Sequence, residues 1–238
     1  MNAEASEQTT PTILIAGASR GLGHAMAAEF LGKGWRVIGT VRGTAPTGLH
    51  DLADASHGRV EVEQLDINEP EGIAALRRRL SGRVLDTLFV NAGTAPQDQF
   101  VQIGEVTTAE FTRVMVTNAL SPMRVIEALQ DLVPATGLIG AMSSGQGSIG
   151  NNVTGMRDVY RASKAALNML MRSFAARPSQ AQRAMVLMAP GWVRTELGGP
   201  DATLGIEDSV PNLVNVLLAQ RGTAGLRYLD YLGRTIPW

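Results

Sequence analysis

Short apolar runs alternate with longer segments of helical character along most of this 238-residue chain. Apolar strands separated by helices favour parallel pairing through right-handed crossovers. We therefore predict an α/β fold with one doubly wound parallel sheet of seven strands and helices on both faces. The expected strands are Thr12–Ala16, Arg36–Val41, Val60–Leu65, Leu85–Val90, Leu138–Met142, Met185–Met188 and Arg227–Leu232. The expected helices are Leu22–Leu31, Pro70–Leu80, residues 107–132 with an interruption near Pro122, Asp158–Ala175, and one that contains Leu213–Leu218.

The composition indicates an ordinary globular protein, with 45% hydrophobic and 18% charged residues and no linker-like change along the chain. We expect a disordered tail over residues 1–10 and a single domain over residues 11–238. A net charge of −1 gives no reason to expect nucleic acid or an anionic membrane as partner. The absence of cysteine excludes thiol catalysis and cysteine-ligated metals. Residues 1–10 lack the pattern of a secretion signal and no apolar run reaches ~18 residues, so we expect a cytoplasmic protein.

A glycine-rich turn follows the first expected strand, with the sequence Gly17-Ala18-Ser19-Arg20-Gly21-Leu22-Gly23. Glycines permit a sharp turn and a close approach to phosphate, and the N–H groups that begin the next helix favour a pyrophosphate. Spaced glycines also arise by chance in a chain that contains 26, so a purely structural turn is the alternative. We predict that a dinucleotide binds to Gly17, Ser19, Arg20, Gly21, Leu22 and Gly23.

The end of the second expected strand suggests which dinucleotide binds. It reads Gly39-Thr40-Val41-Arg42, without the carboxylate that usually holds the ribose hydroxyls of NAD. Arg20 and Arg42 could instead hold a 2′-phosphate, because guanidinium groups pair well with phosphate oxygens. Two solvated surface arginines are the alternative. We predict that NADP(H) is preferred over NAD(H).

Tyr160 and Lys164 lie four residues apart near the start of an expected helix, so their side chains share one face. A neighbouring ammonium favours the phenolate, and we expect it to lower the pKa of the phenol. A drop of ~3 units, or about 4 kcal/mol, would bring that pKa toward the working pH, where proton transfer is most effective. The pair therefore predicts a tyrosine that acts as general acid and base.

Two further polar positions are candidates for the same site. Ser143 and Ser144 follow the fifth expected strand, where open α/β sheets bind ligands. A serine there can donate to a substrate carbonyl, although paired serines are also common in turns; we choose Ser144. Asn118 lies in the interrupted helix and could hold a backbone carbonyl or a water, or be purely structural.

These motifs follow one another in the order typical of the short-chain dehydrogenase/reductase family, which the chain resembles from about Ile13 onward. The resemblance rests on Gly17–Gly23, Asn91-Ala92-Gly93, Asn118, Ser144, Tyr160 with Lys164, and Pro190–Thr195. The segments around Ser144 and Tyr160, with Ile236-Pro237-Trp238, look like the C-factor-like subgroup of the family. The resemblance implies a Rossmann fold and an NAD(P)-dependent oxidoreductase acting on a small carbonyl compound or alcohol.

The resemblance also implies roles for single residues and requires no metal. Tyr160 would be general acid in reduction and general base in oxidation, and Lys164 would lower its pKa and bind the nicotinamide ribose. Ser144 would orient the carbonyl, and Asn118 would hold a water in a proton relay. The implied cofactor contacts are Asp66 and Ile67 at the adenine, Asn91, Ala92 and Gly93 at its ribose, and Pro190, Gly191, Val193 and Thr195 at the carboxamide. A homodimer or homotetramer packed through the helices of Asn118 and Tyr160 is also implied.

Three features depart from the usual family pattern. Asn91 stands alone where a pair of asparagines is common, and the segment between Ser144 and Tyr160 is longer than in most relatives. The segment after Thr195 is short, which predicts an open pocket.

The alternative function is a dinucleotide-binding sensor or a C-factor-like signalling protein without catalysis. The complete Ser-Tyr-Lys-Asn set favours the enzyme.

Overall fold

The structure is a computed structural model that describes residues 10–238. Its centre is a seven-stranded parallel sheet in the order β3-β2-β1-β4-β5-β6-β7, which confirms the predicted fold. The strands are β1 (Thr12–Ala16), β2 (Arg36–Val41), β3 (Val60–Gln64), β4 (Thr87–Val90), β5 (Leu138–Met142), β6 (Ala184–Ala189) and β7 (Gly225–Asp230). The tail predicted over residues 1–10 lies almost wholly outside the described residues.

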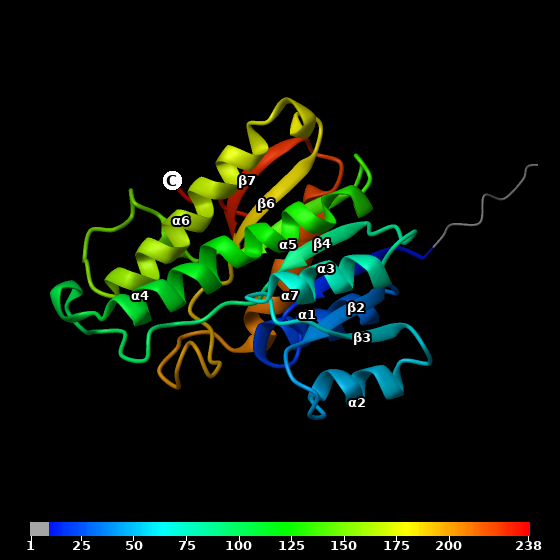
Figure 1. Cartoon of the computed structure of the whole chain (residues 1–238), viewed down its shortest axis with the longest axis horizontal. Helices are drawn as coiled ribbons and strands as arrows, with labels where there is room; N and C mark the ends of the chain where they lie inside the picture. The colour runs from blue at the N-terminus through cyan, green and yellow to red at the C-terminus, as the bar shows by residue number, and fades with distance from the viewer. Residues whose placement is uncertain (1–9) are drawn as a thin grey trace, which may run out of the picture.

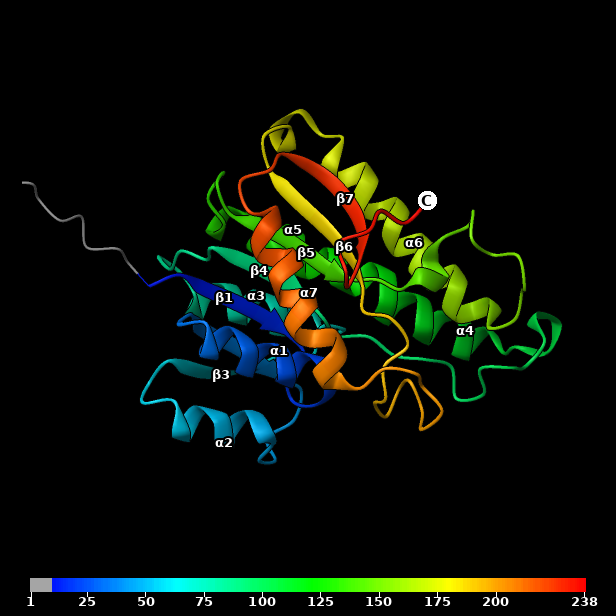
Figure 2. The same cartoon turned by 180° about the vertical axis from the view of Figure 1, so that it is seen from behind.

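Helices cover both faces of this sheet. One face carries α3, α5 and α6, with α4 packed beside α6 (Figure 1). The other face carries α1 and α7, and α2 lies beside α1 and β3 (Figure 2). The helices are α1 (Gly21–Gly32), α2 (Gly48–Ala55), α3 (Pro70–Arg79), α4 (Thr108–Met115), α5 (Ser121–Leu129), α6 (Asp158–Ala175) and α7 (Ile206–Gln220).

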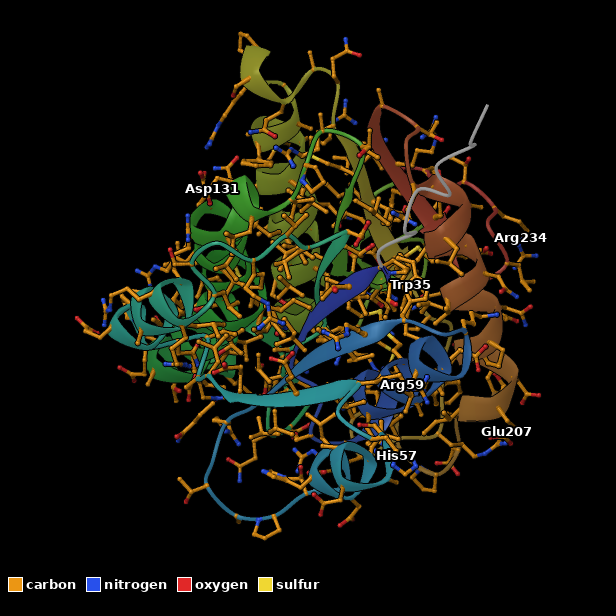
Figure 3. The ribbon with its side chains drawn as sticks, turned by 90° about the vertical axis from the view of Figure 1, so that its right-hand side faces the viewer. Trp35, His57, Arg59, Asp131, Glu207 and Arg234 are labelled. Carbon is orange, nitrogen blue, oxygen red and sulfur yellow. The ribbon has the colours of Figure 1, made fainter. Side chains whose placement is uncertain are left out.

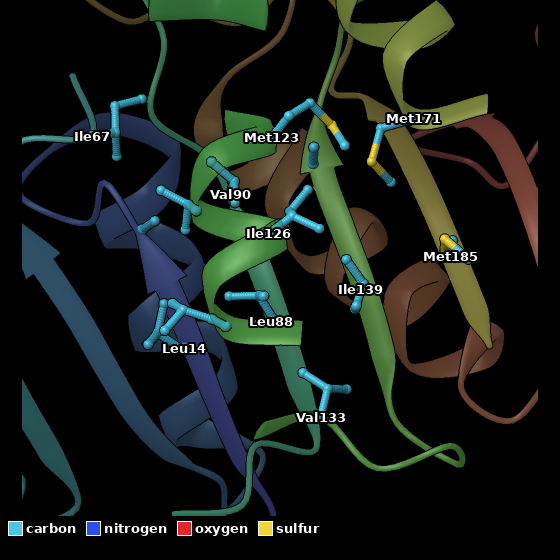
Figure 4. Packing of buried hydrophobic residues seen from close by; sticks show 14 of the residues in the cluster. Leu14, Ile67, Leu88, Val90, Met123, Ile126, Val133, Ile139, Met171 and Met185 are labelled. Carbon is cyan, nitrogen blue, oxygen red and sulfur yellow. The ribbon is translucent and has the colours of Figure 1, made fainter. Parts of the chain in front are cut away.

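The hydrophobic core is divided by the sheet into two clusters. Strands β1, β4, β5 and β6 are buried along their whole length, as expected for parallel strands covered on both faces. On one face Leu14, Leu88 and Ile139 point toward Ile126 of α5 (Figure 4). This packing fixes the strand ends at one edge of the sheet, where the candidate site lies.

Trp35 joins the elements on the opposite face. Its ring lies 5.1 Å from that of Phe30 in α1, and the guanidinium of Arg221, just after α7, lies 4.9 Å from the Trp35 ring centroid. Charged side chains such as Asp131, Glu207 and Arg234 point outward from the body of the protein (Figure 3). Within residues 10–238, no helix combines the length and apolar character needed to cross a membrane.

The element boundaries differ from the sequence prediction in a few places. Helix α2 was not predicted, although Leu49 and Leu52 lie one helical turn apart and a capping box formed by Thr47 and His50 begins it. Strand β7 begins at Gly225 rather than Arg227, and α7 is longer than the Leu213–Leu218 core. These differences leave the strand order and the position of the site unchanged.

The predicted interruption of the long helix lies one turn before Pro122. Residues Val116–Leu120 form a π-helical segment, in which the Ser121 N–H donates to the Val116 carbonyl five residues earlier. Pro122 has no N–H, so the carbonyl of Asn118, four residues before it, cannot receive an α-helical bond from that position. The proline therefore explains why the irregular segment is centred on Asn118.

Candidate active site

The glycine turn lies where the order of the strands reverses, between β1 and β4. Gly17 and Gly21 have φ angles of +90° and +57°, a region that favours glycine. A Cβ on Gly17 would lie 2.8 Å from the Cβ of Ala92, and one on Gly23 would lie 2.0 Å from the Gly17 carbonyl oxygen. The Asn91 amide donates to the same oxygen at 2.7 Å. The turn thus forms a glycine-lined cradle at the amino end of α1, which fits a pyrophosphate.

The two arginines predicted to hold a 2′-phosphate have different surroundings. Arg20 forms an exposed ion pair with Glu196, with 3.0 Å between guanidinium nitrogen and carboxylate oxygen. Arg42 is exposed immediately after β2, and only its main-chain carbonyl has a partner among the hydrogen bonds of residues 10–238, at 3.5 Å from Gln64. Thr40, two residues earlier in β2, stabilises the glycine turn, because its hydroxyl accepts from the Gly17 N–H at 2.9 Å. The structure therefore leaves Arg42 as the freer of the two guanidinium groups.

The remaining predicted cofactor residues surround this cradle at the carboxyl ends of the strands. Ser19 and Leu22 lie within the turn, and Asp66 and Ile67 follow β3, where the Asp66 carboxylate accepts from the Asn68 N–H at 2.9 Å. Asn68, which sequence reasoning missed, binds Thr117 at 3.1 Å and Ser121 at 2.8 Å, linking this loop to the π-helical segment.

Residues 190–195 form a tight loop after β6. Gly191 has a φ angle of +85°, and the Ser209 hydroxyl of α7 donates to the Pro190 carbonyl at 2.6 Å. Val193 pairs with Leu204 in an isolated β-bridge. The Thr195 hydroxyl accepts from the Gly198 N–H at 3.0 Å, and its methyl group would be 3.8 Å from a Cβ on Gly21. The loop after β6 therefore lies close to the glycine turn after β1.

Tyr160 and Lys164 lie buried on the face of α6 that turns toward the end of β5. The Lys164 Nζ donates to the Met142 carbonyl at 3.0 Å and lies 5.8 Å from the ring centroid of Tyr160. A Cβ on Gly93, at the end of β4, would lie 3.3 Å from both the Lys164 Nζ and the Asn118 Oδ1. The predicted helix spacing thus brings phenol, ammonium and the fourth-strand turn together.

The predicted lowering of the Tyr160 pKa is wrong. Burial raises the pKa of Tyr160 to about 12, although the adjacent Ser144 hydroxyl and the charge of Arg157 act in the opposite direction. Burial also lowers the pKa of Lys164 to about 8. Removing the phenolate from water outweighs the influence of nearby cations. At neutral pH the phenol therefore holds its proton and can act as a donor.

The two serines after β5 have separate environments. The Ser143 hydroxyl is buried and donates to the Asn168 Oδ1 at 2.7 Å, which is a structural bond to α6. The Ser144 hydroxyl is only partly buried and accepts from the Gln146 N–H at 3.1 Å. Ser144 rather than Ser143 therefore lies beside Tyr160, and its hydroxyl can donate a hydrogen bond there.

Asn118 connects the π-helical segment to the other parts of the site. Its Oδ1 accepts from the Thr94 N–H at 2.8 Å, and its Nδ2 donates to the Thr94 carbonyl at 2.8 Å and to the Ser163 hydroxyl at 2.9 Å. The amide is fully buried, and both of its donor hydrogens have partners. The side chain therefore fixes the loop after β4 against α6. The main-chain carbonyl of Asn118 is a separate group, and Pro122 cannot donate an α-helical hydrogen bond to it.

Arg157 is a residue of this region that sequence reasoning missed. It immediately precedes α6 and, like Met156 before it, has a left-handed backbone, with φ angles of +59° and +63°. Its guanidinium lies 5.4 Å from the ring centroid of Phe100. Non-glycine residues in this conformation are uncommon and often occur at functional sites. The longer Ser144-to-Tyr160 segment noted in the sequence is the signal that pointed here.

Within residues 10–238, no three acidic or histidine side chains gather in a way that could hold a metal ion. The geometry instead combines a phosphate cradle with a serine, a tyrosine and a lysine at neighbouring strand ends. Such an arrangement can bind a dinucleotide and exchange a proton with a substrate oxygen beside it.

Comparisons with known proteins agree with this arrangement. The family model described as short chain dehydrogenase matches residues 11–203. The C-signal protein of Myxococcus xanthus is 36% identical over 156 residues, which are 65% of this chain and 93% of that protein. A short-chain dehydrogenase/reductase of Burkholderia multivorans, solved with bound NADP, is 65% identical with a TM-score of 0.95, covering 96% of this chain and 100% of that one.

A carbonyl reductase of Pseudomonas aeruginosa in complex with NADP is 34% identical with a TM-score of 0.89, covering 97% of this chain and 100% of that chain. The sheet order, the glycine cradle and the order of the motifs therefore coincide with a match over most of the sequence. The chain belongs to the short-chain dehydrogenase/reductase family of oxidoreductases.

Proposed function

We propose that the protein is an NADP(H)-dependent carbonyl reductase or alcohol dehydrogenase acting on a small carbonyl compound or alcohol. The observation that carries the proposal is the convergence of Ser144, Tyr160 and Lys164 at the end of β5. The glycine cradle opens at the same edge of the sheet, two strands away. Relatives of known structure that bind NADP, among them a carbonyl reductase, support the cofactor and the substrate class.

When bound, NADP(H) supplies or accepts the hydride, and the protein binds, orients and transfers a proton. The cradle of Gly17, Gly21 and Gly23 would hold the pyrophosphate. In reduction, the Ser144 hydroxyl would donate a hydrogen bond to the carbonyl oxygen, and Tyr160 would give its proton to that oxygen. Its raised pKa of about 12 keeps the phenol protonated at neutral pH, as a proton donor must be.

Lys164 and Asn118 would support this proton transfer. The ammonium of Lys164 lies near the phenol ring and would stabilise the tyrosinate left after the proton has gone. Asn118 fixes the loop after β4 through Thr94, and its main-chain carbonyl, without a helical donor from Pro122, would accept from a water that returns the proton.

Substitution of Tyr160 by Phe tests the chemistry. The variant keeps the ring and loses only the hydroxyl, so we expect turnover to fall at least about 100-fold, within the range of a lost general acid. Binding of NADPH, measured by fluorescence titration, should change little. Turnover comparable to wild type would contradict the role of Tyr160.

The preference for NADP(H) is proposed from Arg42 and, to a smaller degree, Arg20, which is engaged by Glu196. Loss of a charged hydrogen bond weakens binding by about 1.5–3 kcal/mol. We therefore expect Arg42→Ala to raise the Kd for NADPH roughly 10- to 100-fold and to leave the Kd for NADH unchanged. Arg36→Ala, at the opposite end of β2, is the matched control. Equal losses for both cofactors would refute the assignment.

The second candidate is a dinucleotide-binding signalling protein without catalysis, which the similarity to C-signal favours. The complete set of Ser144, Tyr160, Lys164 and Asn118 argues for the enzyme, since a sensor has no need of a proton donor. Oxidation of NADPH, measured with a panel of aldehydes, ketones and diketones, distinguishes the enzyme from the signalling protein.

We also propose a cytoplasmic location, which cell fractionation tests.

A homodimer or homotetramer is proposed from an apolar surface on α4, the π-helical segment and α6. Its lining residues are Met115, Val116, Ala119, Leu120, Ala166, Met169 and Leu170. Met169, Leu120 and Leu170 are 61%, 41% and 39% exposed, so the surface presents several apolar side chains together. A second copy packed on the same two helices would cover it. We expect Met169→Glu to reduce the mass measured by light scattering; a monomeric wild type would refute the proposal.

A further inference from the structure

The segment Ile236–Trp238 folds back over the loop that follows Ser144. The Trp238 carbonyl accepts from the Gly150 N–H at 3.0 Å, and the Pro237 carbonyl accepts from the Ser148 hydroxyl at 2.5 Å. The Ile236 N–H donates to the Tyr228 carbonyl at 2.9 Å. These residues tie the loop after β5 to strand β7, although about 90 residues of sequence separate them.

The Trp238 ring lies between α6 and β7. Its centroid is 5.4 Å from that of Tyr228, and the guanidinium of Arg172 in α6 lies 4.6 Å from the Trp238 ring. Tilted aromatic and cation–π contacts of this kind hold a ring in place as well as burying it. Trp238 therefore packs against the ring of Tyr228 and restrains it.

Tyr228 reaches from β7 to the catalytic loop. Its ring is almost fully buried, and its hydroxyl donates to the main-chain carbonyl of Ser144. Burial raises the pKa of Tyr228, so the hydroxyl keeps the proton that it donates. Asn168 holds the following residues, because its Nδ2 donates to the Gly147 carbonyl at 3.2 Å. The peptide that carries Ser144 is thus fixed by side chains that take no part in the proposed chemistry.

We propose that Tyr228, restrained by Trp238, is a positioning residue that fixes the peptide of Ser144 and thereby aims the Ser144 hydroxyl at the substrate carbonyl. The inference rests on the proposed function. A bond to the Ser144 carbonyl restricts rotation of its peptide plane, and the serine side chain turns with that plane. The Ser144 hydroxyl oxygen also accepts from the Gln146 N–H at 3.1 Å, which restrains the position of that oxygen further.

The test uses Tyr228→Phe, which removes the hydroxyl and keeps the packed ring, with Tyr231→Phe as the matched control. A misplacement of ~1 Å lowers the rate up to about 100-fold, so we expect kcat for Tyr228→Phe to fall about 10- to 100-fold. The Kd for NADPH should stay within about twofold, because the Tyr228 hydroxyl bonds the loop after β5 and not the glycine cradle. Trp238→Leu should produce a smaller fall of the same kind.

A double-mutant cycle separates positioning from general stability. If Tyr228 acts through Ser144, Tyr228→Phe should lower kcat little further in a Ser144→Ala background, because the group being aimed is gone. An equal fall in both backgrounds, or an unchanged kcat for Tyr228→Phe, would overturn the inference while the proposed function stands. Absence of turnover in wild type with every carbonyl compound would overturn both. Should Tyr228→Phe not fold, Trp238→Leu carries the same cycle.

Discussion

The Lys164 Nζ lies 3.0 Å from the main-chain carbonyl oxygen of Met142 and donates a hydrogen bond to it. This bond joins α6 to the end of β5, immediately before the two serines. The ammonium is buried, and its pKa is lowered to about 8 because burial disfavours the charged form. Lys164 is therefore held at the candidate site at the expense of folding stability, as is common for functional groups.

Replacing Lys164 by Met should reveal this penalty as a pH-dependent stability difference. The lysine pKa is about 8 folded and 10.5 unfolded, so between these values the unfolded state binds more protons and wild-type stability rises with pH. We expect the stability of wild type relative to Lys164→Met to increase by about 2–3 kcal/mol between pH 7 and pH 10. Urea unfolding at both pH values measures it.

Lys33→Met is the control for that experiment, because Lys33 pairs with Glu29 at 3.3 Å on the surface of α1. Its stability relative to wild type should be nearly the same at pH 7 and pH 10. A relative stability of Lys164→Met that likewise does not change with pH would show that the buried lysine titrates at its ordinary pKa.

Gly93, shortly after β4, lies between the side chains of Asn118 and Lys164. An added Cβ would lie 3.3 Å from both the Asn118 Oδ1 and the Lys164 Nζ, closer than most such contacts. We expect Gly93→Ala to displace one or both groups and to lower kcat/KM about 10- to 100-fold. Steady-state kinetics and thermal unfolding measure the two effects. A loss of stability without any loss of kcat/KM would contradict the roles proposed for these two side chains.

The sequence was sufficient to predict the sheet, because strand–helix alternation and the handedness of crossovers leave few topologies. It also identified the helix face shared by Tyr160 and Lys164. It could not indicate the direction of the Tyr160 pKa shift, since spacing shows that a cation is near but not how deeply the phenol is buried. Nor could it reveal the bond from Tyr228 to Ser144, because residues 84 apart meet only once β7 lies beside β6.

Arg157 should influence the proton affinity of Tyr160 through its charge. That charge lowers the phenol pKa against the larger effect of burial, so its removal should raise the pKa further above its ordinary value. If the Tyr160 phenolate is the base in alcohol oxidation, as proposed, Arg157→Gln should move the rising limb of the pH–rate profile to higher pH. Arg157→Lys, which retains the charge, should leave the profile in place. A common shift in both variants would assign the effect to the loop conformation instead.

Gly23 and Gly32 provide a matched pair of substitutions within α1. A Cβ on Gly23 would lie 2.0 Å from the Gly17 carbonyl oxygen and 2.6 Å from the Asn91 Nδ2. Gly17 cannot move away easily, because it is itself packed against Ala92. We therefore expect Gly23→Ala to lower the melting temperature and to weaken NADPH binding more than about 10-fold, since the cradle must open. Outside the neighbouring backbone of its own helix, no atom lies within 4 Å of a Cβ on Gly32, so Gly32→Ala should leave binding intact and stabilise the helix by up to about 1 kcal/mol. Titration with NADPH measures the Kd of both variants. Equal Kd values for Gly23→Ala and Gly32→Ala would show that the turn at Gly23 does not form the cofactor site.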